Sequence, residues 1–149
     1  MTAGIPLLAA CGMLQTGLAH EGLPQQLAVA TPAHYLTIVV TGPLGTTRRV
    51  TRLPVTDRAQ IARIESALED LPPFPPGTFN CPNDNGSNMQ LVFRATASSP
   101  VLEEVTASES GCGVVAVVVG GASEPARSGG IGFASQVLAI VHAAGAPAS

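Results

Sequence analysis

Alternating and β-branched apolar positions predict a series of strands along the body of the chain. Residues 34–41 and 46–53 flank a Gly-Pro-Leu-Gly turn, and this arrangement is typical of a β-hairpin. Further strands are predicted where β-branched residues gather again, at residues 89–96, 101–109 and 113–119. The last of these runs is apolar on both faces, so we expect a central strand that is covered on both sides.

Apolar residues recur at helical intervals in two other stretches. The stretch from Asp57 to Leu71 begins with the residue spacing of a capping box and is ended by two prolines. The second stretch runs from Ile131 to Ala144, with Gly145 as the expected stop, and residues 120–130 before it are expected to form a loop. Helices and strands do not alternate regularly. The expected fold is therefore α+β, an antiparallel sheet of about four to five strands with two helices packed on one face.

Residues 1–33 differ in composition from the body of the chain. The run Leu8-Ala9-Ala10-Cys11 matches a bacterial lipobox, in which a cysteine thiol at the cleavage site receives a diacylglycerol. No Lys or Arg precedes Arg48, so either the positively charged region of a signal lies upstream of this start or the match is accidental. We expect a truncated signal segment and flexible tether over residues 1–33, a single α+β domain over 34–145 and a tail over 146–149.

Charge and length narrow the classes of function. The 149 residues suit one domain, and the net charge is −3, with ten acidic residues against seven basic ones that are all Arg. This excludes the basic face of an ordinary nucleic-acid-binding domain and a polybasic membrane patch. The expected partner is a protein or a small ligand, with no nucleic acid, and with membrane contact only through a lipid anchor at Cys11. Arg48, Arg49 and Arg52 are expected on a solvated edge strand, with a basic binding site as the alternative.

The three cysteines divide into one near the N-terminus and two in the body, Cys81 and Cys112. If Cys11 is lipidated or removed, an even pair remains, as expected for an exported protein with one disulfide. Two unpaired thiols, one of them buried, are the alternative. The sequence has no Cys-x-x-Cys and no paired histidines, so we expect no metal site and no cofactor.

The segment that follows the first helix carries a distinctive set of motifs. It contains Leu-Pro-Pro, Pro-Pro-Gly, an aromatic residue, Cys-Pro, an acidic residue and Gly, and later an alternating strand and Ser-Gly-Cys. These positions are Leu71, Pro72, Pro73, Pro75, Pro76, Gly77, Phe79, Cys81, Pro82, Asp84, Gly86, Leu91, Phe93, Ser110, Gly111 and Cys112. Over residues 54–144 the chain resembles an uncharacterised exported, lipoprotein-like domain of actinobacteria and related high-GC bacteria. The resemblance implies export and a Cys81–Cys112 disulfide, and it implies no activity.

The sequence carries few groups that fit a catalytic arrangement. Glu103 and Glu109 with His34 could supply an acid and a base, yet carboxylates on a strand are commonly exposed and solvated. No Gly-x-Ser-x-Gly nucleophile motif occurs. A calcium loop around Gly86 fails because its first and last ligand positions would be Cys81 and Val92. We therefore expect no catalytic residues.

Three functions are compatible with these features. The first is an extracytoplasmic, non-catalytic module, tethered to the outer face of the cell membrane or secreted, that binds a partner or has a structural role. The alternative is a secreted protease-inhibitor-like domain that presents the Pro-rich loop 72–82, because a preorganised loop loses little entropy on binding. The third is a small hydrolase that would use Glu103, Glu109 or His34. The candidate binding residues of the loop are Pro73, Phe74, Pro75, Pro76 and Phe79.

Overall fold

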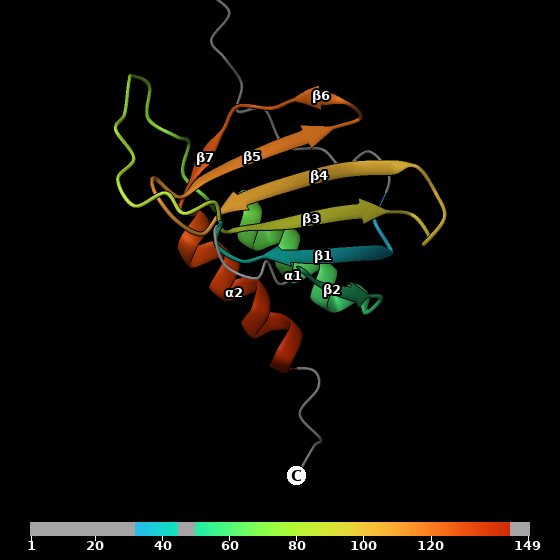
Figure 1. Ribbon diagram of the computed structural model, residues 1–149. Coiled ribbons are helices and arrows are strands. Elements are labelled where there is room, and N and C mark those ends of the chain that lie inside the picture. The colour runs from blue at the N-terminus through green and yellow to red at the C-terminus, as the bar shows by residue number, and fades with distance from the viewer. Residues whose placement is uncertain (1–31, 45–49, 144–149) are drawn as a thin grey trace, which may run out of the picture.

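The computed structural model describes residues 32–44 and 50–143 of the chain. Cys11, Arg48, Arg49 and Gly145 lie outside the described residues, so the predictions made for them stay predictions. Seven strands and two helices occupy the described part of the chain. They form two layers, with the sheet on one side and both helices on the other (Figure 1).

All seven strands belong to one antiparallel sheet. Their order is β2-β1-β3-β4-β5-β6, and β7 also pairs with β5. The strands β1 and β3 therefore pair side by side inside the sheet, although β2 and a helix lie between them in the sequence. The bounds are β1 (Tyr35–Thr41), β2 (Val50–Val55), β3 (Asn88–Arg94), β4 (Val101–Ser108), β5 (Val114–Val119), β6 (Ala122–Ser123) and β7 (Arg127–Ser128).

The helices α1 (Arg58–Glu69) and α2 (Gly130–Ala143) pack side by side on the inner face of the sheet. The Asp57 side chain accepts a hydrogen bond from the Gln60 backbone N–H at 3.0 Å, which caps α1 at its predicted start. The Gln60 side chain donates in turn to the carbonyl oxygens of Ile140 and Val141, at 3.1 and 3.2 Å. The beginning of α1 is thereby tied to the end of α2, so the two helices run antiparallel.

The hydrophobic core fills the space between the helices and the inner face of the sheet. Alternation along β3 turns Met89, Leu91 and Phe93 toward the helices, and all three are fully buried. The helix α2 adds Phe133 and Val137 to the same cluster. No helix among the described elements covers the opposite face of the sheet, which is here called the open face.

The α+β class is confirmed, and so are the two helices on one face. The expected strand count is wrong, because the sheet has seven strands instead of about four to five. The additional strands, β6 and β7, lie in the stretch 120–130 that the sequence assigns to a loop. Each has two residues, which is too short to show alternation, and each forms because its backbone pairs with β5.

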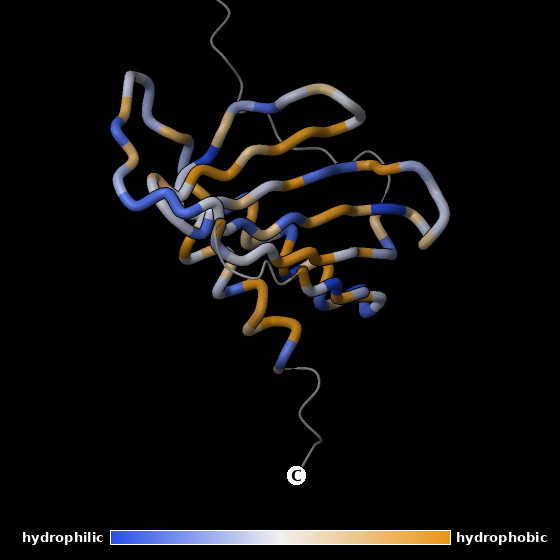
Figure 2. Tube along the Cα trace, viewed as in Figure 1, coloured by the Kyte–Doolittle hydropathy of each residue, from blue (hydrophilic) through white to orange (hydrophobic). Residues whose placement is uncertain are grey.

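The valine-rich strand β5 is not the doubly covered strand that its apolar run predicts. Val115 and Val117 are buried under the helices, whereas Ala116 on the open face is exposed. Figure 2 shows β5 as hydrophobic along its length, although only its inner face is covered. Its composition therefore reflects the preference of β-branched residues for strands as much as burial. Ile131 also departs from expectation, since it is 52% exposed at the start of α2 instead of packing in the core.

Gly130 allows the start of α2 to approach the backbone of the sheet closely. Its N–H donates to the Gly113 carbonyl oxygen at 2.7 Å. A Cβ atom at this position would lie 2.6 Å from the carbonyl oxygen of Ser108 and 2.9 Å from that of Gly113. Neither contact can be relieved by a side-chain rotation, because both oxygens belong to the backbone.

Replacing Gly130 with Ala is expected to lower the free energy of unfolding by about 2 kcal/mol, because the sheet backbone must shift. Gly132→Ala in the same helix is the matched control, since nothing lies within 4 Å of its Cβ position. There alanine should raise the free energy of unfolding by about 0.5–1 kcal/mol through its helix propensity. Urea denaturation measures both values, and equal effects at the two positions would contradict this packing of α2.

Candidate functional site

The segment between α1 and β3 projects away from both layers of the fold (Figure 1). Eight of the nine residues from 72 to 80 are exposed, and Phe74 is half-buried. This segment, residues 72–80, is here called the proline loop. Pro73, Pro75, Pro76 and Phe79, four of the five binding residues predicted from the sequence, are therefore on the surface.

The first arm of the proline loop is hydrogen-bonded to the end of the sheet. The Phe74 N–H donates to the carbonyl oxygen of Ala126 at 2.8 Å, and the Ser128 N–H donates to that of Pro72 at 2.9 Å. Pro73 forms an isolated antiparallel bridge to the strand β7. The loop thus begins as a short extension of the sheet, although it has no strand pattern in its sequence.

The second arm is held by the predicted disulfide, which is confirmed. Cys81 and Cys112 are bonded with their Cα atoms 5.0 Å apart, and the bond joins the loop to the turn that leads into β5. Between the arms, the ring of Phe79 packs edge-on against that of Phe74 with centroids 5.3 Å apart. The proline loop is therefore fixed at both ends and braced across its middle.

A polar network next to the disulfide fixes the chain as it returns to β3. The buried Ser110 hydroxyl donates to Asp84 Oδ1 at 3.0 Å and accepts from the Asn85 N–H at 3.2 Å. The same Asp84 oxygen accepts a hydrogen bond from the Gly86 N–H at 3.0 Å. This network and the disulfide connect the same two segments, so each restricts the movement that the other leaves open.

Exposed large hydrophobic residues gather at the same end of the sheet. The described part of the chain has five of them, Leu44, Val50, Phe79, Val101 and Ile131. The Leu44 backbone N–H is hydrogen-bonded to the loop that follows the disulfide, and Val50 is the first residue of β2 at that end of the sheet. Ile131 lies beside the turn that contains Cys112. Only Val101 lies at the other end, where β4 begins. An accumulation of exposed apolar side chains around a rigid loop is typical of a binding surface.

Glu103 departs from the solvated strand carboxylate that the sequence predicts. It lies on the inner face of β4 and is only 2% exposed. The pKa of Glu103 is raised to about 7, mainly by burial and further by the carboxylates of Glu65 and Glu69 on α1, while Arg127 opposes the rise. Its neighbour Glu104 is on the open face, where it accepts a hydrogen bond from the Gln90 side chain at 2.8 Å.

Glu65 is part of the same arrangement beneath α1. One of its carboxyl oxygens is buried and has no hydrogen-bond partner among the described residues. Burial raises the pKa of Glu65, and the carboxylate of Glu69 adds to this effect. Two carboxyl groups in one poorly solvated region favour the protonated form, so this arrangement costs stability at neutral pH.

The three residues of the proposed hydrolase do not meet in one place. Glu103 lies near the start of β4 and Glu109 directly follows its end, so they are about 20 Å apart at the rise of a strand. His34 precedes β1, and β3 lies between β1 and β4. Burial raises the pKa of Glu109, but within the described residues its position at the far end of β4 separates it from Glu103 and His34.

Arg127 is a structural residue that no sequence pattern identifies. Its Nη1 donates to the carbonyl oxygens of Glu69 at 3.0 Å and Leu71 at 2.9 Å. It therefore closes the C-terminal end of α1 at the point where the proline loop begins. Its partners are backbone carbonyls 58 and 56 residues away, so neither charge pairing nor periodicity could reveal the contact.

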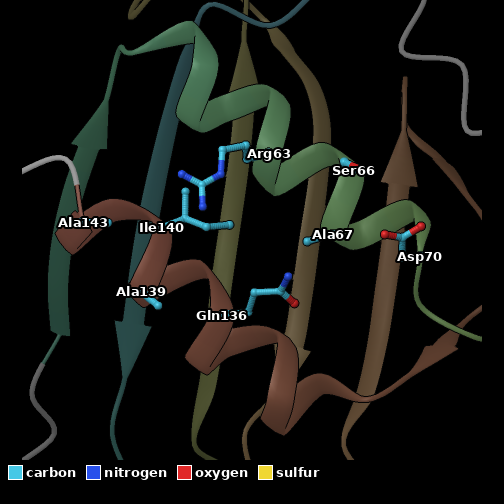
Figure 3. A pocket seen from close by; sticks show the side chains of 8 residues that line it. All are labelled: Arg63, Ser66, Ala67, Asp70, Gln136, Ala139, Ile140 and Ala143. Carbon is cyan, nitrogen blue, oxygen red and sulfur yellow. The ribbon is translucent and has the colours of Figure 1, made fainter.

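A shallow groove of about 440 Å³ lies between α1 and α2 on the outer side of the helix layer. Figure 3 shows Arg63 reaching from α1 toward α2 and Gln136 reaching back, with Ala67 and Ala139 leaving the space between them. Among the described residues the lining contains no His or Cys, and its one carboxylate, Asp70, is at the end of α1. The groove offers polar contacts but no acid–base pair.

Arg52 is exposed on β2, the edge strand of the sheet, as predicted.

Among residues 32–44 and 50–143, no group of three or more His, Cys, Asp or Glu side chains is placed to hold a metal ion. Neither helix in these ranges has the length and apolar character needed to cross a membrane. The disulfide indicates a non-reducing environment.

Comparisons of the chain with protein-family models, with curated proteins and with solved structures find no match. The resemblance to an exported, lipoprotein-like domain therefore stays a prediction. In the geometry of this chain, the braced proline loop is the most distinctive surface feature.

The free energy of unfolding should fall by up to about 3 kcal/mol as the pH rises from 4.5 toward 7. In this range Glu103 still holds its proton in the folded protein but has lost it in the unfolded chain, so folding is favoured at the lower pH. Glu103→Gln should remove most of this slope and leave the contributions of Glu65 and Glu109, whose pKa values burial also raises, and Glu104→Gln on the open face should leave the slope unchanged. Urea denaturation across the pH range tests this; a slope of undiminished size in Glu103→Gln would show that other groups cause it.

Proposed function

We propose that the protein is a non-catalytic, extracytoplasmic module that binds a partner protein through the proline loop. The observation that carries this proposal is that the loop is exposed along nearly its whole length and yet fixed at both ends. A loop that is ordered before binding loses little conformational entropy when a partner arrives, so its contacts contribute more fully to affinity.

The chemistry of the loop end supports a protein partner. Phe79 and Ile131 expose aromatic and aliphatic surface there, and prolines restrict the backbone between the two arms. Exposed aromatic residues are enriched at protein interfaces, where they act as anchors that fill a pocket of the partner. The separation of His34, Glu103 and Glu109 favours this binding role over hydrolysis.

Export and tethering are part of the same proposal. The disulfide is favoured outside the reducing cytoplasm, and the lipobox-like run that ends at Cys11 would supply a lipid anchor at the outer face of the cell membrane. The resemblance to an exported, lipoprotein-like domain supports the same location. A tether of about twenty residues between Cys11 and β1 would hold the domain close to the membrane surface.

A photoreactive phenylalanine analogue at position 79 should form a discrete cross-linked protein adduct in the native host. The same analogue at position 101 is the matched control, because Val101 is exposed to a similar degree at the end of the sheet that is remote from the proline loop. Adducts of equal yield at the two positions, or none at position 79, would refute binding through the loop.

Expression from an upstream start in a related host should yield a mature protein that begins at Cys11 and partitions into detergent. Mass spectrometry of the N-terminal peptide should find a diacylglycerol on the Cys11 sulfur, and Cys11→Ser should prevent both cleavage and partitioning. Recovery of an unmodified soluble chain that retains Met1 would refute the lipid anchor.

A protease-inhibitor-like role is the second candidate, favoured by the exposed stretch 78–80 directly before Cys81. If a protease cut this stretch, the disulfide would fix the new amino end and the hydrogen bonds of Pro72 and Phe74 to the sheet would fix the new carboxyl end, which favours religation. Titration against a panel of serine proteases should then show stoichiometric inhibition that Phe79→Asp weakens at least about tenfold. Rapid cleavage of the loop without inhibition would eliminate this candidate.

A further inference from the structure

A hollow of about 300 Å³ lies on the open face of the sheet, beside the loop that returns from the disulfide to β3. We propose that it is a binding site for an organic cation, an ammonium or guanidinium group on an alkyl stem. This inference does not depend on the role of the proline loop, which projects from the fold as a separate surface. The residues that carry it are Asp84, Asn88, Thr106, Ser108, Val114 and Ala116.

The polar side chains of the hollow are held in place by the protein itself. The Asn88 side-chain Nδ2 donates to the Gly86 carbonyl oxygen at 3.1 Å, and the Ser108 hydroxyl donates to that of Ser110 at 2.8 Å. Asp84 is fixed through Oδ1, which accepts from the Gly86 N–H and the Ser110 hydroxyl. The Cys81–Cys112 bond restrains the same loop, so the site is formed before a ligand arrives.

These internal bonds decide which ligand chemistry the hollow prefers. They engage the Ser108 hydroxyl proton and one of the two Asn88 amide protons, so acceptors outnumber donors: the Asn88 amide oxygen, the Ser108 oxygen lone pairs and Asp84 Oδ2 remain, against the second Asn88 proton and the Thr106 hydroxyl. Asp84 is also the only charged residue that the described part of the chain contributes to the lining. A lining of fixed acceptors with one negative charge favours a ligand that carries several N–H donors and a positive charge.

The remainder of the lining fits the rest of such a ligand. Val114 and Ala116 on β5 give the hollow an apolar wall, and Thr106 lies directly opposite Ala116 on the neighbouring strand β4. Alkyl stems of Lys-like and Arg-like groups pack along apolar surface while their charged ends stay hydrogen-bonded. The volume is at the lower limit of small-molecule sites, which suits one side-chain-sized group.

The cation could belong to a protein side chain or to a free amine, and the probes separate these sources. The full chain with its disulfide intact is titrated with N-acetyl-arginine amide and with agmatine while backbone amide shifts are recorded. N-acetyl-citrulline amide is the neutral isostere, and erythritol is the neutral polyol. We expect saturable shifts of Gly86, Ser87 and Asn88 with the two cations, at least about fivefold weaker binding of the isostere, and no saturation with erythritol.

The variant Asp84→Asn removes the charge but keeps an oxygen that can accept from Gly86 and Ser110. It should weaken cation binding at least about fivefold without lowering the unfolding midpoint. Asp70→Asn, in the groove between the helices, is the matched control and should bind as the wild type does. Tighter binding of the arginine amide assigns the site to a protein partner, and tighter binding of agmatine assigns it to a free amine. Equal affinity for the citrulline isostere, unchanged binding by Asp84→Asn, or saturation by erythritol would overturn the proposal.

Discussion

The disulfide between Cys81 and Cys112 is the constraint on which the functional surface depends. It crosses from the loop after α1 to the turn before β5, and it closes a segment that contains two whole strands, β3 and β4. Both ends of that segment are polar, Gly-rich turns with little apolar surface to hold them. The covalent bond restrains these turns where hydrophobic packing does not, so the exposed loop and the shallow hollow beside it keep fixed shapes.

The two faces of the sheet differ in composition, because only the inner face packs against the helices. The inner face contributes Met89, Leu91 and Phe93 to a core that both helices cover, whereas the open face carries polar side chains from the same strands. Glu103 is an exception on the inner face, since a carboxyl group occupies a position where an apolar residue would be more stable. Its burial makes the stability of the domain depend on pH near neutrality.

The main features of the fold can be predicted from the sequence because they rest on periodic patterns. The five longer strands, both helices, the Asp57 cap and the single disulfide have local or compositional signals. β6 and β7 have none, since two residues pair only because β5 is beside them. The burial of Glu103 and the two carbonyl contacts of Arg127 also depend on residues that are distant in sequence, so no local pattern could reveal them.

The central claim is that the disulfide orders the proline loop before any partner binds. Backbone order parameters from ¹⁵N relaxation can be measured at Phe74, Gly77, Thr78, Phe79 and Asn80, the loop residues that have an amide proton. We predict values of about 0.85 in the oxidised protein, like those of β3, and values below about 0.6 at residues 77–80 after selective reduction, while Phe74 stays bonded to the sheet. Low values in the oxidised protein, or no change on reduction, would contradict the account.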